Sequence, residues 1–408
     1  MCEELTMKNI IKAGVIGLGA RGSAMLDGVL LKNPEIEVTA VCDIYEDRRE
    51  SAKEKVEKAY GRQPFATGDH HEIVALPEID AIFVFTDWTT HISIAIEAME
   101  HKKAVAMEVV CAYSVRECWD LVRAYEKTNA PFMMLENCCF DREELLATNL
   151  VRKGILGTIV HCSGAYGHDL REEIADGYKN RHYRKANYLR RNCENYPTHE
   201  LGPIAKILGI NRGNRMLSLV SFASKSAGMA EYIREKRSDE YFGGLTYNQG
   251  DVITTLIKCA GGETICLKLD TTLPRRYDRE FTVRGTKGNF SQSAKFVFLD
   301  GDNEWAELKD SVDNLDKYAE YLPPVWKNMT EEQKQSGHGG MDGITVDAFV
   351  QSLKKGCAMP VDVYDAAAWM CVSALSEESI STGSVVAIPD FTEGKWITRE
   401  LKDVIELD

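Results

Sequence analysis

The sequence lacks the short motifs that mark the commonest catalytic sites. None of its 12 cysteines forms a C-x-x-C pair, and neither H-E-x-x-H nor G-x-S-x-G occurs. The first two patterns bind zinc, and the third positions an activated serine. We therefore expect no metal site, and a hydrolase with this sequence would need another source of catalytic power.

Basic residues are outnumbered by acidic ones, 49 to 63, and long apolar runs are lacking. The 408 residues carry a formal net charge of −14, which repels polyanions and argues against nucleic acid as a partner. No apolar stretch reaches membrane-spanning length, and the first residues show no export signal. We interpret the cysteines as reduced and mostly buried thiols, and we expect a cytoplasmic protein with no membrane partner.

Residues 1–137 show an alternation of strand and helix patterns. The apolar runs AGVIGL, VTAVCD, AIFVFT, KAVAME and PFMMLE are separated by helical patterns. One helical pattern begins with Ser114 and Glu117 in the spacing of a capping box. This alternation predicts the α/β class, with a doubly wound parallel sheet as the N-terminal domain.

Residues 138–408 follow a different pattern. Strand-like runs succeed one another without intervening helices, and CAGGET is typical of a hairpin turn between two of them. This predicts a C-terminal α+β domain with a large, mostly antiparallel open sheet, a candidate surface for homo-oligomer formation. We expect the two helical patterns near the C-terminus to pack back on the first domain, and residues 231–244 to form a charged loop.

The stretch GLGARG places Gly17, Gly19 and Gly22 in G-x-G-x-x-G spacing. It follows an apolar strand and opens a helix, which is the context that dinucleotide binding requires. Asp43 ends the next strand, where a carboxylate binds the ribose and favours NAD over NADP. Arg48 lies just beyond Asp43 in the sequence, so binding of NADP instead of NAD stays open. The alternative interpretation is a glycine turn in a domain that binds no nucleotide.

Three further strand ends are expected to line the same crevice, because ligands bind at the carboxyl ends of parallel strands. They are residues 86–91 (TDWTTH), 107–110 (MEVV) and 135–138 (LENC). Helix capping or packing could explain any one of these residues alone. As a set, they are candidates for the wall of a cofactor site.

Tyrosine and histidine gather in two stretches of the second part. GAYGHDLRE holds Tyr166 and His168, and NYPTHELGP holds Tyr196 and His199. The last two stand three residues apart, which would place them on one face of a helix that begins there. Both residue types move protons near neutral pH when their pKa values are tuned, so these stretches form a candidate catalytic site. Ordinary packing, or a helix cap at Thr198, is the alternative.

Three more stretches extend this cluster. Arg184 opens a basic run that continues to residue 192, TTLPRRYDRE adds Tyr277, and GHGGMD adds His338 and Asp342. Arginine and tyrosine hydrogen-bond well to sugar hydroxyls and amide carbonyls. We therefore place these residues with the second, substrate-binding cluster.

The N-terminal residues resemble the Gfo/Idh/MocA oxidoreductase superfamily, which pairs a Rossmann domain with an open-sheet domain. In most of its dehydrogenases, the strand corresponding to MEVV ends in Glu-Lys-Pro, and the lysine helps to remove the substrate's proton. Here Glu108 is kept, but Val109 and Val110 stand in place of the lysine and the proline. Further on, YPTHELGPIAKILGINRGNR, GHGGMD and DVYDAAAW resemble the NAD-dependent α-N-acetylgalactosaminidases of glycoside hydrolase family 109, and this similarity spans nearly the whole chain.

This resemblance implies hydrolysis with catalytic NAD and no net redox change. Hydride leaves sugar C3, a base removes the C2 proton, the C1 oxygen is eliminated, water adds, and the hydride returns. The cofactor contacts that it implies are Arg21, Gly22, Asp43, Trp88, Thr89, Thr90, His91, Glu108, Val109 and Asn137. The sugar contacts that it implies are Tyr166, Arg184, Tyr196, Pro197, Thr198, His199 and Tyr277. Tyr166 is our candidate for the C2 base, and His168 is expected to assist either Tyr166 or the leaving group. His199, together with Tyr196, is our candidate for handling the proton of the C3 hydroxyl.

The expected substrate is a small glycoside or oligosaccharide ending in N-acetylgalactosamine, with an α-linkage favoured. Because elimination starts at C2 and C3, related sugars and β-linkages stay open. Two other functions also stay open at this point. One is a sugar oxidoreductase that releases NADH, and the other is a non-catalytic protein that senses a sugar and NAD.

Overall fold

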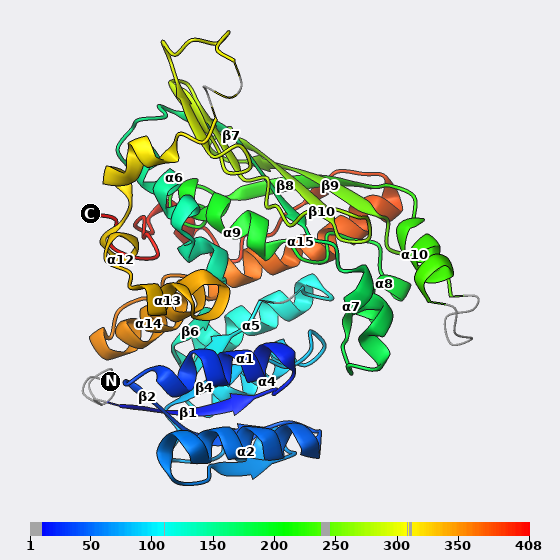
Figure 1. Cartoon of the computed structure of the whole chain (residues 1–408), viewed down its shortest axis with the longest axis vertical. Coiled ribbons are helices and arrows are strands. Elements are labelled where there is room, and N and C mark those ends of the chain that lie inside the picture. Colours follow the sequence, from blue (N-terminus) through cyan, green and yellow to red (C-terminus); the bar gives the residue numbers. More distant parts are fainter. Residues whose placement is uncertain (1–9, 110, 238–244, 308, 310–311) are drawn as a thin grey trace.

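The computed structural model describes residues 10–109, 111–237, 245–307, 309 and 312–408. A six-stranded parallel sheet contains the N-terminal strands, with the order β3-β2-β1-β4-β5-β6 (Figure 1). This order is that of a doubly wound dinucleotide-binding fold, which confirms the predicted class. The strands are β1 (Ile11–Ile16), β2 (Ile36–Cys42), β3 (Phe65–Thr67), β4 (Ala81–Val84), β5 (Ala104–Met107) and β6 (Phe132–Met134).

Helices connect these strands, as parallel pairing requires. The main ones are α1 (Ala20–Gly28), α2 (Glu46–Tyr60), α3 (His70–Val74), α4 (His91–Glu100) and α5 (Val115–Thr128), with the short turn η1 (Leu30–Lys32) after α1. Both hydrogen bonds of the predicted capping box, between Ser114 and Glu117, are present at the start of α5. Every residue of β4 and β5 is buried, as expected for the central strands of a sheet that is covered on both faces.

The second sheet has eight strands in the order β13-β12-β11-β7-β10-β9-β8-β14. All neighbours are antiparallel except β7 and β10, so the predicted mostly antiparallel sheet is confirmed, with one parallel pair. The strands are β7 (Ile159–Gly167), β8 (Met216–Ala223), β9 (Val252–Cys259), β10 (Thr264–Asp270), β11 (Thr282–Gly285), β12 (Gly288–Ser291), β13 (Phe296–Leu299) and β14 (Val386–Ala387).

Helices cover one face of this sheet and join it to the first domain. The helices after β6 are α6 (Arg142–Arg152), α7 (Arg171–Ala175), α8 (Arg184–Arg190), α9 (Thr198–Ile207), α10 (Gly228–Lys236), α12 (Pro324–Lys327), α13 (Glu331–Lys334), α14 (Met341–Lys355) and α15 (Val363–Thr382). The 3₁₀ turns are η2 (Asn137–Phe140), η3 (Asp176–Tyr178), η5 (Leu315–Tyr321), η6 (Gly337–Gly340) and η7 (Lys395–Ile397). The expected charged loop at 231–244 is wrong for its first part, since α10 extends to Lys236, and residues 238–244 lie outside the described chain.

α15 lies between the two sheets (Figure 1). It contacts α5 and β6 of the first domain and β8 of the second sheet. Its residues are buried along most of its length, including Trp369 at 0% exposure, as expected for a helix surrounded by core. Asp362 caps its first turn through hydrogen bonds to two backbone N–H groups. The C-terminal helices therefore belong to the core that both sheets share.

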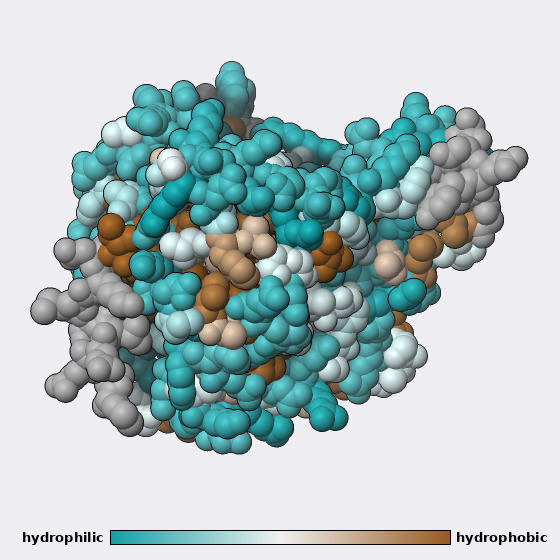
Figure 2. All heavy atoms as spheres, turned by 90° about the horizontal axis from the view of Figure 1, so that it is seen from below, coloured by the Kyte–Doolittle hydropathy of each residue, from teal (hydrophilic) through white to brown (hydrophobic). Residues whose placement is uncertain are grey.

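One face of the molecule shows how exposed hydrophobic residues are distributed on it. The face shown in Figure 2 is mostly hydrophilic, with small and scattered hydrophobic patches. Of the helices in the described residues, none is both long enough and apolar enough to cross a membrane.

Candidate functional site

Two glycines of the loop between β1 and α1 are required by the packing of the protein itself. Gly17 has a φ of +94°, and a Cβ there would lie 2.5 Å from the carbonyl carbon of Phe85. A Cβ on Gly22 would lie 1.9 Å from the carbonyl oxygen of Gly17. Both glycines are therefore required for the tight turn and for close packing of α1 on the sheet.

Gly19 differs from the other two. It precedes α1 with an ordinary φ of −63°, and a Cβ there would meet only the Arg48 guanidinium, at 3.5 Å. Within the described chain, nothing close requires glycine at this position. A pyrophosphate at the N-terminus of α1 would require it, because the ligand must approach the backbone closely. The loop therefore fits a dinucleotide.

Asp43 follows β2 and closes the loop from the other side. One of its carboxylate oxygens accepts a hydrogen bond from the Leu18 N–H at 2.7 Å, and the other accepts one from the Tyr45 N–H at 2.9 Å. Arg48 lies 3.6 Å from the same carboxylate. Each carboxylate oxygen retains acceptor capacity, so Asp43 is held in a fixed position beside the loop, where it could also receive a ribose hydroxyl.

The loop after β4 contributes one ring to the site and hydrogen-bonds mostly within itself, although Nε2 of His91 is buried and has no hydrogen-bond partner among the described residues. Thr89 and Thr90 hydrogen-bond within the loop, to Asp87 and, for Thr90, also to Thr86. Nδ1 of His91 lies 2.8 Å from the Asp87 carbonyl, and burial lowers the pKa of His91 to about 4, so this ring is neutral. These hydrogen bonds within the loop fix its shape. The Trp88 ring packs outside the loop, against the second cluster.

Trp88 is 2% exposed and connects the loop after β4 with the second cluster through its ring contacts. Its ring centroid lies 5.8 Å from that of Tyr196. The Arg184 guanidinium lies over both rings, 5.5 Å from the Trp88 centroid and 4.8 Å from the Tyr196 centroid. Arg184 also forms an ion pair with Glu173, with an N–O distance of 2.6 Å. A buried cation thus stands between the predicted cofactor and sugar regions.

Five rings meet in the second cluster. Tyr166 stacks on Tyr196 at 4.4 Å between centroids, and His199 lies edge-on to both, at 5.6 and 4.9 Å. The Tyr166 hydroxyl is 3.2 Å from Nδ1 of His168. His168 in turn lies edge-on to Tyr277 at 5.1 Å, and the Tyr277 ring is 43% exposed at the rim. The predicted proton-transfer residues are therefore adjacent to one another.

The surroundings of Tyr166 and His168 set the protonation of both side chains. Burial raises the pKa of Tyr166 to about 12, so its hydroxyl is protonated at neutral pH. Burial and the charge of Arg184 lower the pKa of His168 below its ordinary value. A neutral His168 can accept a hydrogen bond from the Tyr166 hydroxyl, and both pKa shifts keep the proton on the Tyr166 oxygen in the resting site.

Glu136 is the important site residue that the sequence did not single out. It is 0% exposed, and Nδ1 of His199 lies 2.7 and 2.9 Å from its two carboxylate oxygens. Burial would raise the pKa of Glu136, but the charge of His199 and the hydrogen bonds from His199 and Thr198 outweigh it and hold this pKa below its ordinary value. An ionised Glu136 accepts a hydrogen bond from the Nδ1–H of His199, which fixes the ring and leaves Nε2 as the nitrogen available to a ligand.

Two expectations about NYPTHELGP are wrong. α9 begins at Thr198, so Tyr196 precedes the helix, and its closeness to His199 is not a helical-face effect. Pro197 occupies the N-cap position, and no side chain caps this helix end. The Thr198 hydroxyl is directed to Glu136 instead.

His338 and Asp342 lie with the cofactor residues and not with the sugar cluster, contrary to expectation. Asp342 accepts hydrogen bonds from Arg21 and from Asn137, and Arg21 also donates to Glu108 at 2.9 Å. The predicted cofactor contacts at the ends of β5 and β6 are thus joined through one carboxylate. The neighbouring Val109 is buried at 4% exposure, and Val110 lies outside the described residues.

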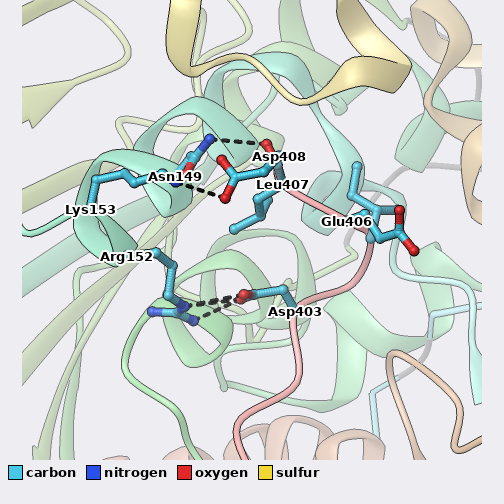
Figure 3. A pocket seen from close by; sticks show the side chains of 8 residues that line it. Asn149, Arg152, Lys153, Asp403, Glu406, Leu407 and Asp408 are labelled. Atoms are coloured by element: carbon cyan, nitrogen blue, oxygen red, sulfur yellow. Dashed lines mark hydrogen bonds and ion pairs between the residues drawn. The ribbon is translucent and has the colours of Figure 1, made fainter.

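A separate hollow of about 490 Å³ lies beside the C-terminal tail (Figure 3). Its charged lining is paired internally, because Arg152 bonds Asp403 and Lys153 bonds Asp408. None of the predicted site residues lines it. The full lining is Asn149, Arg152, Lys153, Asp403, Ile405, Glu406, Leu407 and Asp408.

Comparison with known proteins agrees with this geometry. Residues 140–398 match the family described as glycosyl hydrolase 109, C-terminal domain, and residues 11–136 match the oxidoreductase family with an NAD-binding Rossmann fold. The chain is 39% identical over 405 residues to glycosyl hydrolase family 109 protein 2 of Phocaeicola vulgatus, covering 96% of each chain. It is 38% identical over 400 residues to an alpha-N-acetylgalactosaminidase of Bacteroides fragilis, covering 95% of this chain and 93% of the relative.

The fold is also similar to that of solved structures. A levoglucosan dehydrogenase in complex with NADH and levoglucosan superposes with a TM-score of 0.69 at 18% identity, covering 93% of this chain and 99% of that one. At this identity, the likeness concerns the fold alone. The N-terminal domain binds NAD, as its family match and the loop geometry agree.

Proposed function

The chain belongs to glycosyl hydrolase family 109, and on this premise we propose that it hydrolyses glycosides that end in N-acetylgalactosamine, with the α-linkage preferred. The relative named alpha-N-acetylgalactosaminidase supports the choice of sugar and linkage. The observation that carries the mechanism is the contact of Tyr166, Tyr196 and His199 beside the cofactor wall, with buried Glu136 on His199. This set places the imidazole of His199 beside the phenol of Tyr166, the two groups to which the proposed scheme assigns proton transfer.

When bound beside these residues, NAD⁺ would supply reversible hydride transfer at sugar C3. The chain's own residues handle the protons. Nε2 of His199 takes the proton of the C3 hydroxyl, and Glu136 stabilises the imidazolium that forms. The Tyr196 ring lies edge-on to the imidazole and helps to orient it.

Tyr166 removes the C2 proton once C3 is a ketone, because the ketone acidifies that position. Its own hydroxyl proton passes to His168 across the 3.2 Å contact, and the same pair can deliver a proton to the leaving oxygen. Arg184 places a fixed positive charge near the oxygen atoms that become negative. Thr198, Pro197 and Tyr277 complete the proposed sugar site at the start of α9 and at its rim.

This scheme explains two features of the sequence together. A hydrolase without net redox change needs no stoichiometric oxidant, so the same NAD molecule serves every turnover. Proton removal from the C3 hydroxyl falls to His199, so the dehydrogenase lysine is not needed where Val109 stands. The protein thus combines a dinucleotide domain with hydrolysis.

One assay tests the proposal. Purified protein is mixed with nitrophenyl α-N-acetylgalactosaminide while nitrophenol and NADH absorbance are both followed. We expect nitrophenol without accumulation of NADH, and solvent deuterium at C2 of the released sugar. Stoichiometric NADH would identify an oxidoreductase, sugar binding without product would identify a sensor, and absence of deuterium at C2 would reject the elimination. Normal turnover by a His199→Ala variant would remove His199 from the mechanism.

We propose that residues 1–137 hold the cofactor and that residues 138–408 hold the sugar. The first sheet lies entirely within the former range, whereas Tyr166 and His199 lie in the latter. A panel of differently linked aminosugar and neutral-sugar glycosides would define the substrate of the second part.

Location and self-association are further proposals. We propose a cytoplasmic protein, because no disulfide joins the eleven cysteines among the described residues. We also propose that the outer face of the second sheet forms a homo-oligomer contact, since Phe222 and Leu256 are 65% and 49% exposed there. Light scattering gives the mass in solution, and a monomer would reject the contact.

A further inference from the structure

The carboxylate of Asp342 gathers side chains from three separate parts of the chain. Its two oxygens accept hydrogen bonds from Arg21 at 2.7 and 2.9 Å and from the Asn137 amide at 2.8 Å. Nδ1 of His338 lies 2.8 Å away. Asp342 lies in the first turn of α14, yet its partner Arg21 lies 321 positions earlier in the chain. The cluster forms only when α14 docks on the cofactor domain.

The carboxylate at the centre of the cluster is buried, whereas Arg21 and His338 are partly exposed. Asp342 is 1% exposed and Asn137 is 4% exposed. Burial would raise the pKa of Asp342, but the hydrogen bonds from Arg21 and His338 outweigh it and hold that pKa well below its ordinary value. The carboxylate therefore stays ionised, and its pairing with Arg21 is of the bidentate kind that fixes a guanidinium in plane.

Arg21 links Asp342 to Glu108. Its Nε donates to one oxygen of Glu108 at 2.9 Å. The other oxygen of Glu108 is buried and has no hydrogen-bond partner among the described residues. Such an atom is costly unless a ligand satisfies it. Glu108 follows β5 directly, at the edge of the sheet where the cofactor binds.

We propose that Asp342 is a positioning residue for NAD: it fixes Arg21 and Asn137, and through Arg21 it orients the free oxygen of Glu108 toward the cofactor. α14 thereby becomes part of the cofactor site although it lies far along the chain. The proposal deepens the proposed function and rests on it only for the placement of NAD beside these residues. It does not depend on the glycosidase chemistry.

The competing explanation is that Asp342 only fastens α14 to the first domain. In that case its loss would lower the melting temperature without changing NAD affinity in the folded protein. Asp347→Asn is the matched control, because this carboxylate of α14 also accepts a hydrogen bond from the first domain, from Asn33 at 2.8 Å, but lies outside the Asp342 cluster.

The test is NAD titration of full-length Asp342→Asn, followed by the change in intrinsic fluorescence and by the rise in melting temperature on adding NAD. Loss of charge-assisted hydrogen bonds of this kind corresponds to about a 10- to 100-fold increase in Kd. We expect that increase for Asp342→Asn, with the Kd of Asp347→Asn within about threefold of the parent value. An Asp342→Asn Kd within twofold of the parent would overturn the proposal.

A second measurement uses the unaltered protein, so that a folding defect in the variant leaves the proposal testable. NAD should slow hydrogen–deuterium exchange of the backbone amides at the start of α14. Unchanged exchange there, while exchange of the glycine loop slows, would overturn the proposal. Neither readout requires substrate, so failure of the glycosidase assay and failure of this inference are separate results.

Discussion

Replacing Glu136 by glutamine tests how the protein makes His199 a base. The substitution keeps the size of the side chain and removes its negative charge. In the parent, the ionised carboxylate contacts Nδ1 of His199 at 2.7 and 2.9 Å and is fully buried. A glutamine amide can donate to Nδ1 and so favour the tautomer in which Nε2 carries the proton. That tautomer cannot accept the proton of the C3 hydroxyl.

The magnitude has a lower and an upper bound. A buried hydrogen bond to a charged group contributes about 1.5–3 kcal/mol, which corresponds to roughly a 10- to 100-fold loss of rate. Loss of a positioned general base costs up to about 10⁴-fold. We therefore expect kcat of Glu136→Gln to fall by about 10²- to 10⁴-fold, with NAD affinity changed by less than about threefold.

The assay is nitrophenol release under saturating substrate, with bound NAD quantified in the same preparation. Glu126→Gln is the matched control, because that carboxylate also pairs with a cation and a hydroxyl, but those belong to Lys395 and Tyr364. It should retain the parent rate. A Glu136→Gln enzyme with more than half of the parent kcat and unchanged NAD content would refute the proposed role of the Glu136–His199 pair.

Three other predictions concern the same region. Tyr166→Phe keeps the ring that stacks on Tyr196 but lacks the hydroxyl, so C2 deuterium incorporation should fall by about 10²-fold or more, and normal incorporation would exclude Tyr166 as the base. Because the pKa of His168 is lowered from the ordinary 6.5, the acid limb of C2 exchange should lie below pH 6.5, and a limb above it would contradict the Tyr166–His168 transfer. Burial raises the pKa of Glu194 from 4.5 to about 8, so the folded state binds its proton more tightly. The stabilisation from this proton is present below pH 4.5 and lost as pH rises toward 8. Glu194→Gln should therefore raise the melting temperature at pH 8 more than at pH 5, and equal shifts would argue against a protonated Glu194.

The sequence predicted the first domain well because its signals are local. The glycine motif, the strand before it and the carboxylate after β2 each act within a few residues, and Gly17 shows the positive φ that such a turn requires. The capping box at Ser114 is equally local. The second sheet was predicted in type, but its parallel β7–β10 pair was not, since that pairing joins strands about a hundred residues apart.

The site was harder to predict because its parts come from distant segments. Tyr196 and His199 were expected on one helical face, yet they meet because the chain turns at Pro197 and both pack on Tyr166. Glu136 gave no signal of its own, since a carboxylate after a strand is common and only tertiary packing places it under His199. The one available clue was its position beside Asn137, at a strand end already expected to face the crevice.

The burial of α15 has a consequence for how the protein unfolds and how it can be divided. Because this helix packs on α5 and β6 on one side and on β8 on the other, its removal would open both cores at once. The two halves should therefore unfold as a single cooperative unit, and a fragment ending near residue 137 should expose apolar surface and aggregate. A rigid central helix also leaves little freedom for the halves to swing apart. That restraint suits an enzyme whose cofactor is regenerated in place and has no need to leave between turnovers.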